Sequence, residues 1–428
     1  MAGAADTVVA DRAMTIELPA PARPGPWTPR VVLALGVLAA SAFIYVTAEI
    51  MPVGALPAIA ADLAVSEALV GTLLASYALV AALATVPLVR WTAAWPRRRT
   101  LLFTLACLTV SQLISALAPN FAVLAMGRVL CALTHGLMWS VIAPIGVRLV
   151  PPTHAARATM AVYGGTGLAL VVGSPLTAAL SEVWGWRLAV AAITAAAAAV
   201  LVAARFAIPA LAVPAPADPA APPARWRTWL VRNRRLLTLS ALTLVGVTGH
   251  FISYTFIVVI IRDVVGVGGP NLAWLLAAYG VAGLVAMGLL ARPGDRRPKA
   301  AVSGCLAGLV VVFTVLAVLA RSDAGGPGPA ALVAGVVAII FWGATATAMP
   351  PMLQSAAMRH APENPDAASG VYVAAFQIGI MAGSLIGGLL YEHGGEAVML
   401  GASALLTAGA LVAVLASAGL FPRLASGK

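Results

Sequence analysis

Long runs of apolar residues, each about the length of a membrane-spanning helix, follow one another along almost the whole chain. A helix needs about 20 apolar residues to cross the hydrocarbon core of a bilayer. Measured against that length, the sequence predicts an all-α membrane protein with twelve spans. The spans cover residues 31–53, 67–89, 101–118, 121–147, 158–181, 186–208, 236–261, 271–291, 300–320, 329–353, 367–391 and 396–421.

A Pro/Ala-rich and then basic segment, residues 209–235, separates the first six predicted spans from the last six. Its composition is typical of a semi-rigid linker that lies against a membrane surface. The predicted organisation is therefore a tail, a six-helix bundle, a linker, a second six-helix bundle and a short tail. These parts cover residues 1–30, 31–208, 209–235, 236–421 and 422–428.

The two predicted bundles carry matching features. The basic segment RWTAAWPRRR (90–99) follows the second span, and ARPGDRRPK (291–299) follows the eighth, which is the equivalent place in the second bundle. Spans five and eleven are both rich in glycine, and in span eleven Gly379, Gly383 and Gly387 repeat every four residues. A ridge of small residues lets membrane helices approach closely. The recurrence favours two pseudo-symmetric bundles that rock about a central site.

Composition and charge support a membrane protein rather than a soluble one. The chain is 61% hydrophobic and 10% charged, whereas soluble domains carry about 25% charged residues. The net charge of +11 raises the question of nucleic acid, but the basic residues gather in alternate loops. If both termini are cytoplasmic, nearly all of the basic residues lie on the cytoplasmic side of the membrane. Only Arg187, Arg262 and Arg321 lie on the opposite side, and Arg128 lies within a span. This positive-inside pattern predicts a multi-pass plasma-membrane protein and not a nucleic-acid-binding one.

Three cysteines lie inside apolar runs with no short spacing between them, so we expect small buried side chains rather than disulfides or metal ligands. The first 30 residues lack a short apolar core with a cleavage site, and no removable signal peptide is expected.

Glu49 is the only acidic residue that lies well inside a predicted span, and Arg128 is the only basic one. A charge at mid-membrane costs about 3 kcal/mol on insertion scales, so such residues are functional candidates. Both residues are expected in the outer half of the membrane at comparable height. Two interpretations stay open: a static ion pair, or a carboxylate that takes up and releases a proton during transport. Pro52 removes a backbone hydrogen bond close to Glu49 and leaves carbonyl groups free.

The few other polar groups in the spans lie beside aromatic residues. His135 and Trp139 share a helix face with Arg128, and His250 shares one with Tyr254. Span eleven adds Tyr372, Phe376 and Gln377, and span one adds Tyr45. Histidines in membrane helices often only bond a neighbouring helix, so both a structural role and a cavity lining stay open. The tandem prolines Pro350 and Pro351 are expected to kink or end span ten.

Several of these segments together resemble the major facilitator superfamily, and within it the drug–proton antiporter branch that includes bacterial sugar efflux transporters. The resemblance covers about 31–421. It is carried by TAEIMPVGALPAIAADL (47–63), RVLCALTHGLMWSVIAPIGVRL (128–149), TGHFISYTFI (248–257), WGATATAMPPMLQ (342–354) and AFQIGIMAGSLIGG (375–388).

The resemblance implies roles for particular residues. Glu49, Arg128 and His135 would couple transport to protons, and the aromatic residues with Tyr45 and Gln377 would line the substrate cavity. Conformational change would involve the glycine series of span five, which is degenerate here: Gly164, then Gly173 and Pro175 with Ser174 between them. It would also involve the loop motifs. The loop after span two keeps Arg97, Arg98 and Arg99 but lacks the usual aspartate, while its mirror loop keeps Asp295, Arg296 and Arg297.

The combined prediction is a secondary transporter that exports small organic molecules, such as sugars or drug-like compounds, in exchange for protons. Export and substrate class are implied by the resemblance alone. An importer of the same fold is the alternative; an intramembrane enzyme is a remote one, because the sequence has no GxSxG, HExxH or CxxC motif. We expect a monomer in the lipid bilayer, no metal and no cofactor, with the proton as coupling ion.

Overall fold

The computed structural model describes residues 27–65, 67–210, 230, 232–268, 270–321, 328–417 and 419–421. Every regular element within these ranges is a helix. Most of the predicted tail 1–30 and linker 209–235, and all of the tail 422–428, lie outside the described residues. The boundaries predicted for these three segments therefore stay predictions.

The first bundle is formed by long helices whose starts are set by capping side chains. Thr28 caps the first helix by accepting from the backbone N–H of Val31, and Asn120 caps the fifth by accepting from that of Val123. The elements are α1 (Pro29–Gly54), α2 (Leu56–Asp62), α3 (Glu67–Trp91), α4 (Arg97–Ala116), α5 (Phe121–Arg148), the 3₁₀ turn η1 (Pro152–His154), α6 (Ala155–Leu168), the π-helix η2 (Ala169–Gly173), α7 (Ser174–Trp184) and α8 (Trp186–Ala207).

The second bundle repeats this arrangement of long helices. Asn233 and Asn364 cap its first and last helices. The elements are α10 (Arg234–Tyr254), α11 (Ile257–Val259), the π-helix η3 (Ile260–Val264), α12 (Pro270–Arg296), α13 (Pro298–Leu319), α14 (Pro329–Arg359) and α15 (Pro365–Ala416).

The observed helices follow the apolar runs closely. Among the described residues, ten helices are long and apolar enough to cross a membrane, and Ser76–Trp91 of α3 forms a shorter apolar helix. The 52-residue α15 comprises two helices, because Gly395 between them has a φ of 68° and a ψ of −171°. This backbone conformation suits glycine. It falls between the two runs predicted for spans eleven and twelve, and the last helix ends at Ala416 rather than at residue 421.

Of the two effects expected of Pro350 and Pro351, an end of span ten is wrong, because α14 continues through both prolines to Arg359; a kink stays a prediction. Membrane helices tolerate proline when neighbouring groups satisfy the freed backbone. Here the hydroxyl of Tyr372 on α15 donates to the carbonyl oxygen of Pro350 at 2.9 Å. This bond joins α14 to α15 at the proline pair, about one turn beyond the carbonyl groups of Ala346 and Thr347 that the two prolines leave without helical donors.

The glycine ridge of α15 packs closely against α10. A Cβ atom added at Gly387 would lie 2.3 Å from the carbonyl oxygen of Ile252, and one at Gly383 would lie 2.7 Å from that of Thr248. Backbone atoms at such distances leave no room for a side chain, so the ridge brings the two helices together as the sequence predicts.

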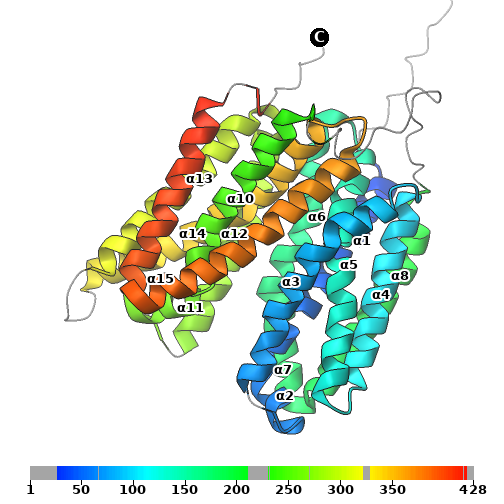
Figure 1. The fold of residues 1–428 in the computed structure, drawn as a ribbon, viewed down its shortest axis with the longest axis horizontal. Helices are drawn as coiled ribbons and strands as arrows, with labels where there is room; N and C mark the ends of the chain where they lie inside the picture. Colours follow the sequence, from blue (N-terminus) through cyan, green and yellow to red (C-terminus); the bar gives the residue numbers. More distant parts are fainter. Residues whose placement is uncertain are drawn as a thin grey trace, which may run out of the picture.

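Figure 1 shows two groups of helices side by side, α1–α8 on the right and α10–α15 on the left. In the upper part of this view the groups meet, through α6 against α12 and α14, and through α3 and α5 against α15. At the lower end, α2 and α7 lie apart from α11 and the middle of α15. Large apolar side chains such as Leu83, Leu289 and Leu405 are exposed on the helices, as expected for surfaces that face lipid.

Candidate functional site

Arg128 is buried in the first bundle and binds the backbone of α1. Pro52 has no N–H, so it leaves the carbonyl of Ala48, four residues earlier, without its helical partner. The Nη1 of Arg128 donates to this oxygen at 2.6 Å, and Nη2 donates to the carbonyl oxygen of Glu49 at 2.7 Å. The side chain of Arg128 is thus held by main-chain oxygens that the proline helps to expose.

The carboxylate of Glu49 has a different neighbour. Its Oε2 lies 3.9 Å from Nδ1 of His135. Among the residues that the structure describes, Arg128 bonds the backbone oxygen of Glu49 and forms no ion pair with its carboxylate. The Glu49 side chain is 24% exposed, in contrast to 5% for His135. In this conformation the clasp between α1 and α5 therefore involves the Glu49 backbone and leaves the carboxylate group accessible for proton exchange.

Tyr77 on α3 joins the groups around Glu49, although no sequence pattern marks it as a candidate. Its hydroxyl lies 2.9 Å from Nδ1 of His135 and 3.3 Å from Sγ of Cys131. The guanidinium carbon of Arg128 lies 4.9 Å from the centre of the Tyr77 ring, a cation–π contact. We call Glu49, Tyr77, Arg128, Cys131 and His135 the carboxylate cluster.

Tyr45, which was predicted to bind substrate, is fully buried in the first bundle. Its hydroxyl donates to the carbonyl oxygen of Thr104 at 3.0 Å and bonds Oγ1 of Thr134 at 3.1 Å. A direct contact with substrate does not fit this placement. Tyr372 is likewise 1% exposed and bonds Pro350, so it supports α14 rather than a ligand in this conformation.

Trp139 lies where α5 approaches the second bundle. Its ring is 6.2 Å from that of His135, which confirms the predicted shared face, and 5.1 Å from that of Tyr163. The carbonyl oxygen of Trp139 accepts from Nε2 of Gln354 on α14 at 3.0 Å. Gln354 also donates to Oγ of Ser369, so this amide ties α5, α14 and α15 together.

An aromatic cluster occupies the second bundle around His250. The sequence selected His250, Tyr254 and Phe376, and the structure adds four residues that were not selected: Phe251 on α10, Tyr279 on α12, Phe313 on α13 and Trp342 on α14. The Nε1 of Trp342 donates to Nδ1 of His250 at 3.1 Å. The cluster comprises His250, Phe251, Tyr254, Tyr279, Phe313, Trp342 and Phe376. Gln377 lies next to Phe376 on α15 and is 6% exposed.

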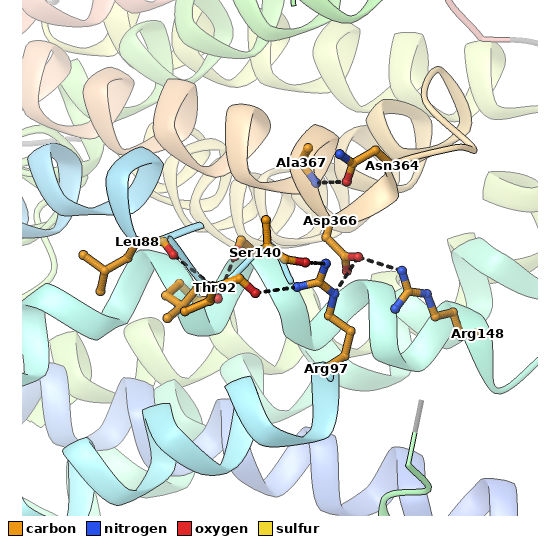
Figure 2. A network of polar contacts seen from close by, with 10 residues as sticks. Leu88, Thr92, Arg97, Ser140, Arg148, Asn364, Asp366 and Ala367 are labelled. Carbon is orange, nitrogen blue, oxygen red and sulfur yellow. Dashed lines mark hydrogen bonds and ion pairs between the residues drawn. The ribbon is translucent and has the colours of Figure 1, made fainter. Parts of the chain in front are cut away.

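Asp366 joins the two bundles at the end where the arginine-rich loops lie. Arg97 on α4 binds its Oδ2 at 2.7 Å and Arg148 on α5 binds the same oxygen at 2.6 Å. Figure 2 shows both guanidinium groups directed at this carboxylate from two sides. Asp366 lies in the first turn of α15, where the helix dipole favours a negative charge. We call this the arginine-rich end of the molecule.

A second ion pair at the arginine-rich end involves Asp295, which the sequence did select. Its Oδ2 accepts from Nε of Arg157 at 2.8 Å, and its Oδ1 accepts from the backbone N–H of Ala156 at 2.7 Å. Asp295 belongs to α12 and its partners to α6, so this contact also joins the bundles. Both carboxylates are nearly buried, at 3% exposure for each residue.

The other arginines of the two loop motifs do not join the bundles in this structure. Arg98 donates to the carbonyl oxygen of Arg205 within the first bundle, and Arg99 lies over the ring of Trp95. Arg296 and Arg297 are exposed. Of the five arginines predicted in these motifs, Arg97 is therefore the one that the structure brings to the contact between the bundles, because its side chain binds Asp366 on α15.

The predicted glycine series of α6 and η2 is only partly a close-packed one. A Cβ added at Gly164 would meet nothing within 4 Å, whereas one at Gly165 would lie 1.9 Å from the carbonyl oxygen of Ala39 on α1. Gly173 does face a neighbour, because a Cβ added there would lie 2.3 Å from Oγ1 of Thr47. Pro175 lies at the start of α7. The close-packed glycine at this point of α6 is therefore Gly165, which was not selected from the sequence, while the conformational role expected of Gly164 stays a prediction.

A model of the Major Facilitator Superfamily matches residues 38–371 and 252–426 of the chain. Chloramphenicol efflux pumps from two Mycobacterium tuberculosis strains, CDC 1551 and H37Rv, are each 64% identical to it over 396 residues. The alignment covers 92% of this chain and 94% of each relative.

Two solved structures share the fold at low sequence identity. A human organic anion transporter superposes with a TM-score of 0.69 at 16% identity, covering 91% of this chain and all of that one. The E. coli fucose:proton symporter superposes with a TM-score of 0.71 at 14% identity, covering 90% and 98%. The predicted family is thereby confirmed. The chain belongs to the major facilitator superfamily, as a multi-pass plasma-membrane transporter of small molecules.

Proposed function

We propose that the chain is a proton-coupled exporter of drug-like organic molecules, with chloramphenicol among its substrates. The observation that carries the proposal is the accessible carboxylate of Glu49 beside His135, in a chain 64% identical to proteins named chloramphenicol efflux pumps. A carboxylate that is free of Arg128 can gain and lose a proton without breaking a buried ion pair. The fucose:proton symporter supports a common fold only, so sugar transport has no comparable support.

We further propose twelve spans with both termini in the cytoplasm, and the predicted division into bundles 31–208 and 236–421. The ten long apolar helices, the shorter one in α3 and the division of α15 at Gly395 support this number. The basic residues at the arginine-rich end support its cytoplasmic placement. We expect the transporter to act as a monomer, which light scattering of the purified protein would test.

In the proposed cycle, this conformation is closed toward the cytoplasm. The ion pairs of Asp366 with Arg97 and Arg148, and of Asp295 with Arg157, hold the bundles together at the arginine-rich end. Glu49 then takes a proton from outside, and neutralising it permits the bundles to rock until the cytoplasmic end opens. Release of the proton to the cytoplasm and binding of the drug complete the exchange.

The proposal is tested by transport into inverted proteoliposomes that contain the full-length protein. An imposed pH gradient, acidic inside, is expected to drive accumulation of radiolabelled chloramphenicol and to stop doing so when a protonophore is added. Glu49→Gln is expected to abolish gradient-driven transport while leaving binding of chloramphenicol within a few-fold of the wild type. Full gradient-driven transport by this variant would contradict the coupling role.

The same assay separates export from import. An importer would move substrate in the same direction as protons. It would therefore accumulate chloramphenicol only when the lumen is alkaline, whereas the exporter accumulates it when the lumen is acidic. Arg187→Gln serves as the control variant, because Arg187, at the start of α8, pairs with Asp62 at the end of α2 and takes no part in the carboxylate cluster.

A further inference from the structure

The hydrogen bond between Trp342 and His250 fixes the position of the histidine proton. An indole nitrogen can only donate, so Nδ1 of His250, which lies 3.1 Å from Nε1 of Trp342, must be the acceptor. A neutral imidazole has one N–H and one acceptor nitrogen. The proton of His250 is therefore on Nε2, and this nitrogen is a hydrogen-bond donor.

The donor nitrogen of His250 is left without a protein partner. In the part of the chain that the structure describes, no hydrogen bond to Nε2 is found, and this atom is not one of the fully buried unpaired atoms. His250 itself is only half-buried. A partly accessible N–H group in a membrane transporter, with its direction set by a second residue, is available to a ligand.

Trp342 is held too firmly to turn away from His250. It is fully buried, and its ring lies 5.0 Å from that of Phe313 and 6.1 Å from that of Tyr279. The next residue, Gly343, lets α14 pack closely against α12, since a Cβ added there would lie 2.1 Å from the carbonyl oxygen of Tyr279. The indole N–H thus keeps its direction, and the tautomer of His250 is kept with it.

The surroundings of the His250 donor are aromatic and uncharged. Its ring stacks on that of Tyr254 at 5.0 Å and an interplanar angle of 25°, and Phe251 and Phe376 lie beside them. Along α10, α12 and α14 the charged residues stand at the helix ends. A ligand here meets ring faces, the N–H group of His250 and the hydroxyl groups of Tyr254 and Tyr279, and no carboxylate from these three helices.

We propose that His250, held by Trp342, donates a hydrogen bond from Nε2 to an acceptor oxygen of an uncharged aromatic substrate, whose ring packs among Tyr254 and Phe376. This inference rests on the proposed export of drug-like molecules and narrows their class. Aromatic cages that bind cations offer ring faces alone. A fixed N–H directed at the ligand repels a positive charge and attracts a nitro, carbonyl or hydroxyl oxygen, so this site discriminates against lipophilic cations.

The test compares binding of chloramphenicol, an uncharged nitroaromatic amide, with binding of tetraphenylphosphonium, a cation without acceptor oxygens. Both are measured on the purified full-length protein in nanodiscs. Trp342→Phe keeps an aromatic ring but removes the N–H, and His250→Phe removes the donor. His250→Phe is expected to weaken chloramphenicol binding about tenfold, as the loss of one ligand hydrogen bond does. Trp342→Phe leaves the donor but no longer fixes its tautomer, so it is expected to weaken binding by a smaller factor, because only part of the population then carries the proton on Nε2. Both variants are expected to leave tetraphenylphosphonium binding unchanged or stronger.

Three further variants separate the hydrogen bond from packing. His250→Gln places an amide N–H close to the position of Nε2 and is expected to retain most of the chloramphenicol affinity. Phe313→Leu disturbs the ring packed on Trp342 but leaves the bond to His250, and is expected to change affinity less than threefold. The double variant Trp342→Phe with His250→Phe is expected to bind no more weakly than His250→Phe, because Trp342 acts on the ligand only through His250.

A spectroscopic measurement tests the tautomer directly. The chain has five histidines, so the ¹⁵N signals of His250 in histidine-labelled protein are assigned by their loss in His250→Gln. The wild type is expected to show a protonated Nε2, and Trp342→Phe a mixture of tautomers.

The inference is overturned if the wild type prefers the cation to chloramphenicol, if both substitutions leave chloramphenicol affinity unchanged, or if Phe313→Leu lowers it as much as Trp342→Phe. Failure of the proposed function looks different. Chloramphenicol binding that depends on His250, without any transport driven by a pH gradient, would support the site and contradict proton-coupled export.

Discussion

The Nη1 of Arg128 lies 2.6 Å from the carbonyl oxygen of Ala48, which Pro52 leaves without a helical partner. A planar guanidinium can serve this oxygen and that of Glu49 at once, whereas an ammonium group is a single point charge. Arg128→Lys is therefore expected to leave a buried acceptor unsatisfied, to lower the free energy of unfolding by about 1–3 kcal/mol, and to slow transport.

A double-mutant cycle tests whether Pro52 is the reason for this bond. In Pro52→Ala the new N–H can satisfy Ala48, so Arg128→Lys is expected to be less damaging in that background. Thermal unfolding of the four proteins gives the interaction energy. Strictly additive losses in stability would show that Arg128 does not compensate for the proline.

Tyr77 is expected to set the pH response of the carboxylate cluster, because its hydroxyl bonds Nδ1 of His135 on the side where Glu49 also lies. Tyr77→Phe keeps the ring beneath Arg128 and removes only this hydroxyl. The pH at which transport is half-maximal is expected to change. Tyr45→Phe is the matched control, since that hydroxyl is equally buried but bonds Thr104 and Thr134. An unchanged pH profile in Tyr77→Phe, or equal changes in both variants, would contradict the role.

Asp366 is expected to hold the arginine-rich end closed. Asp366→Asn leaves Arg97, which is 4% exposed, without its ion-pair partner, and breaking a buried pair in this way costs about 3–5 kcal/mol. The closed conformation should therefore lose population. A disulfide between Val89→Cys and Gly370→Cys reports on it, because an added Cβ at Gly370 would lie 3.4 Å from Cβ of Val89.

The cross-linking yield, measured with the natural cysteines replaced by alanine, is expected to fall in Asp366→Asn. Asp263→Asn is the control, because Asp263 pairs with its exposed neighbour Arg262 within the second bundle. Equal yields in Asp366→Asn and the control would show that the ion pair does not stabilise the closed conformation.

Asp62 is expected to contribute to stability only above acidic pH. Its hydrogen bond from Arg187 lowers the pKa of this carboxyl below the ordinary value of 3.8. A lowered folded-state pKa gives stability that is present above the unfolded pKa and is lost as the pH falls through the folded one. Asp62→Asn should thus lower the Tm slightly at pH 7 and have a smaller effect near pH 3. The carboxylate is 45% exposed, so the effect is small; an effect of the same size at both pH values would contradict it.

The sequence predicted the long helices because membrane spans are encoded by length and hydrophobicity, which need no tertiary information. It also selected Glu49, Arg128 and His135, since a charge or an imidazole within an apolar run stands out. It could not show that Arg128 turns to the backbone of α1, because a sequence does not reveal which oxygens are near.

Other functional candidates gave no local signal. Asp366 follows a proline in a short polar loop, where an acid is unremarkable until α15 brings it to Arg97. Tyr77 and Trp342 are aromatic residues in apolar runs, and only the packed structure shows that each bonds a histidine. Gly165 differs from its neighbour Gly164 in helix phase, because one residue rotates a helix by about 100°.

This difference in helix phase leads to a prediction with a built-in control, since Gly164 and Gly165 are neighbours on α6. An added methyl group at Gly165 would collide with the backbone of Ala39 at 1.9 Å, and a backbone cannot move aside as a side chain can. Gly165→Ala is expected to separate α1 from α6 and to cost about 1–3 kcal/mol or more. Gly164→Ala meets open space and should be neutral or stabilising by up to about 1 kcal/mol, because alanine favours a helix over glycine.

Thermal unfolding and chloramphenicol transport of the two variants check this. Because α1 carries Glu49, only Gly165→Ala should lower transport as well as the Tm, and equal behaviour of the two variants would show that contact between α1 and α6 does not position the carboxylate cluster.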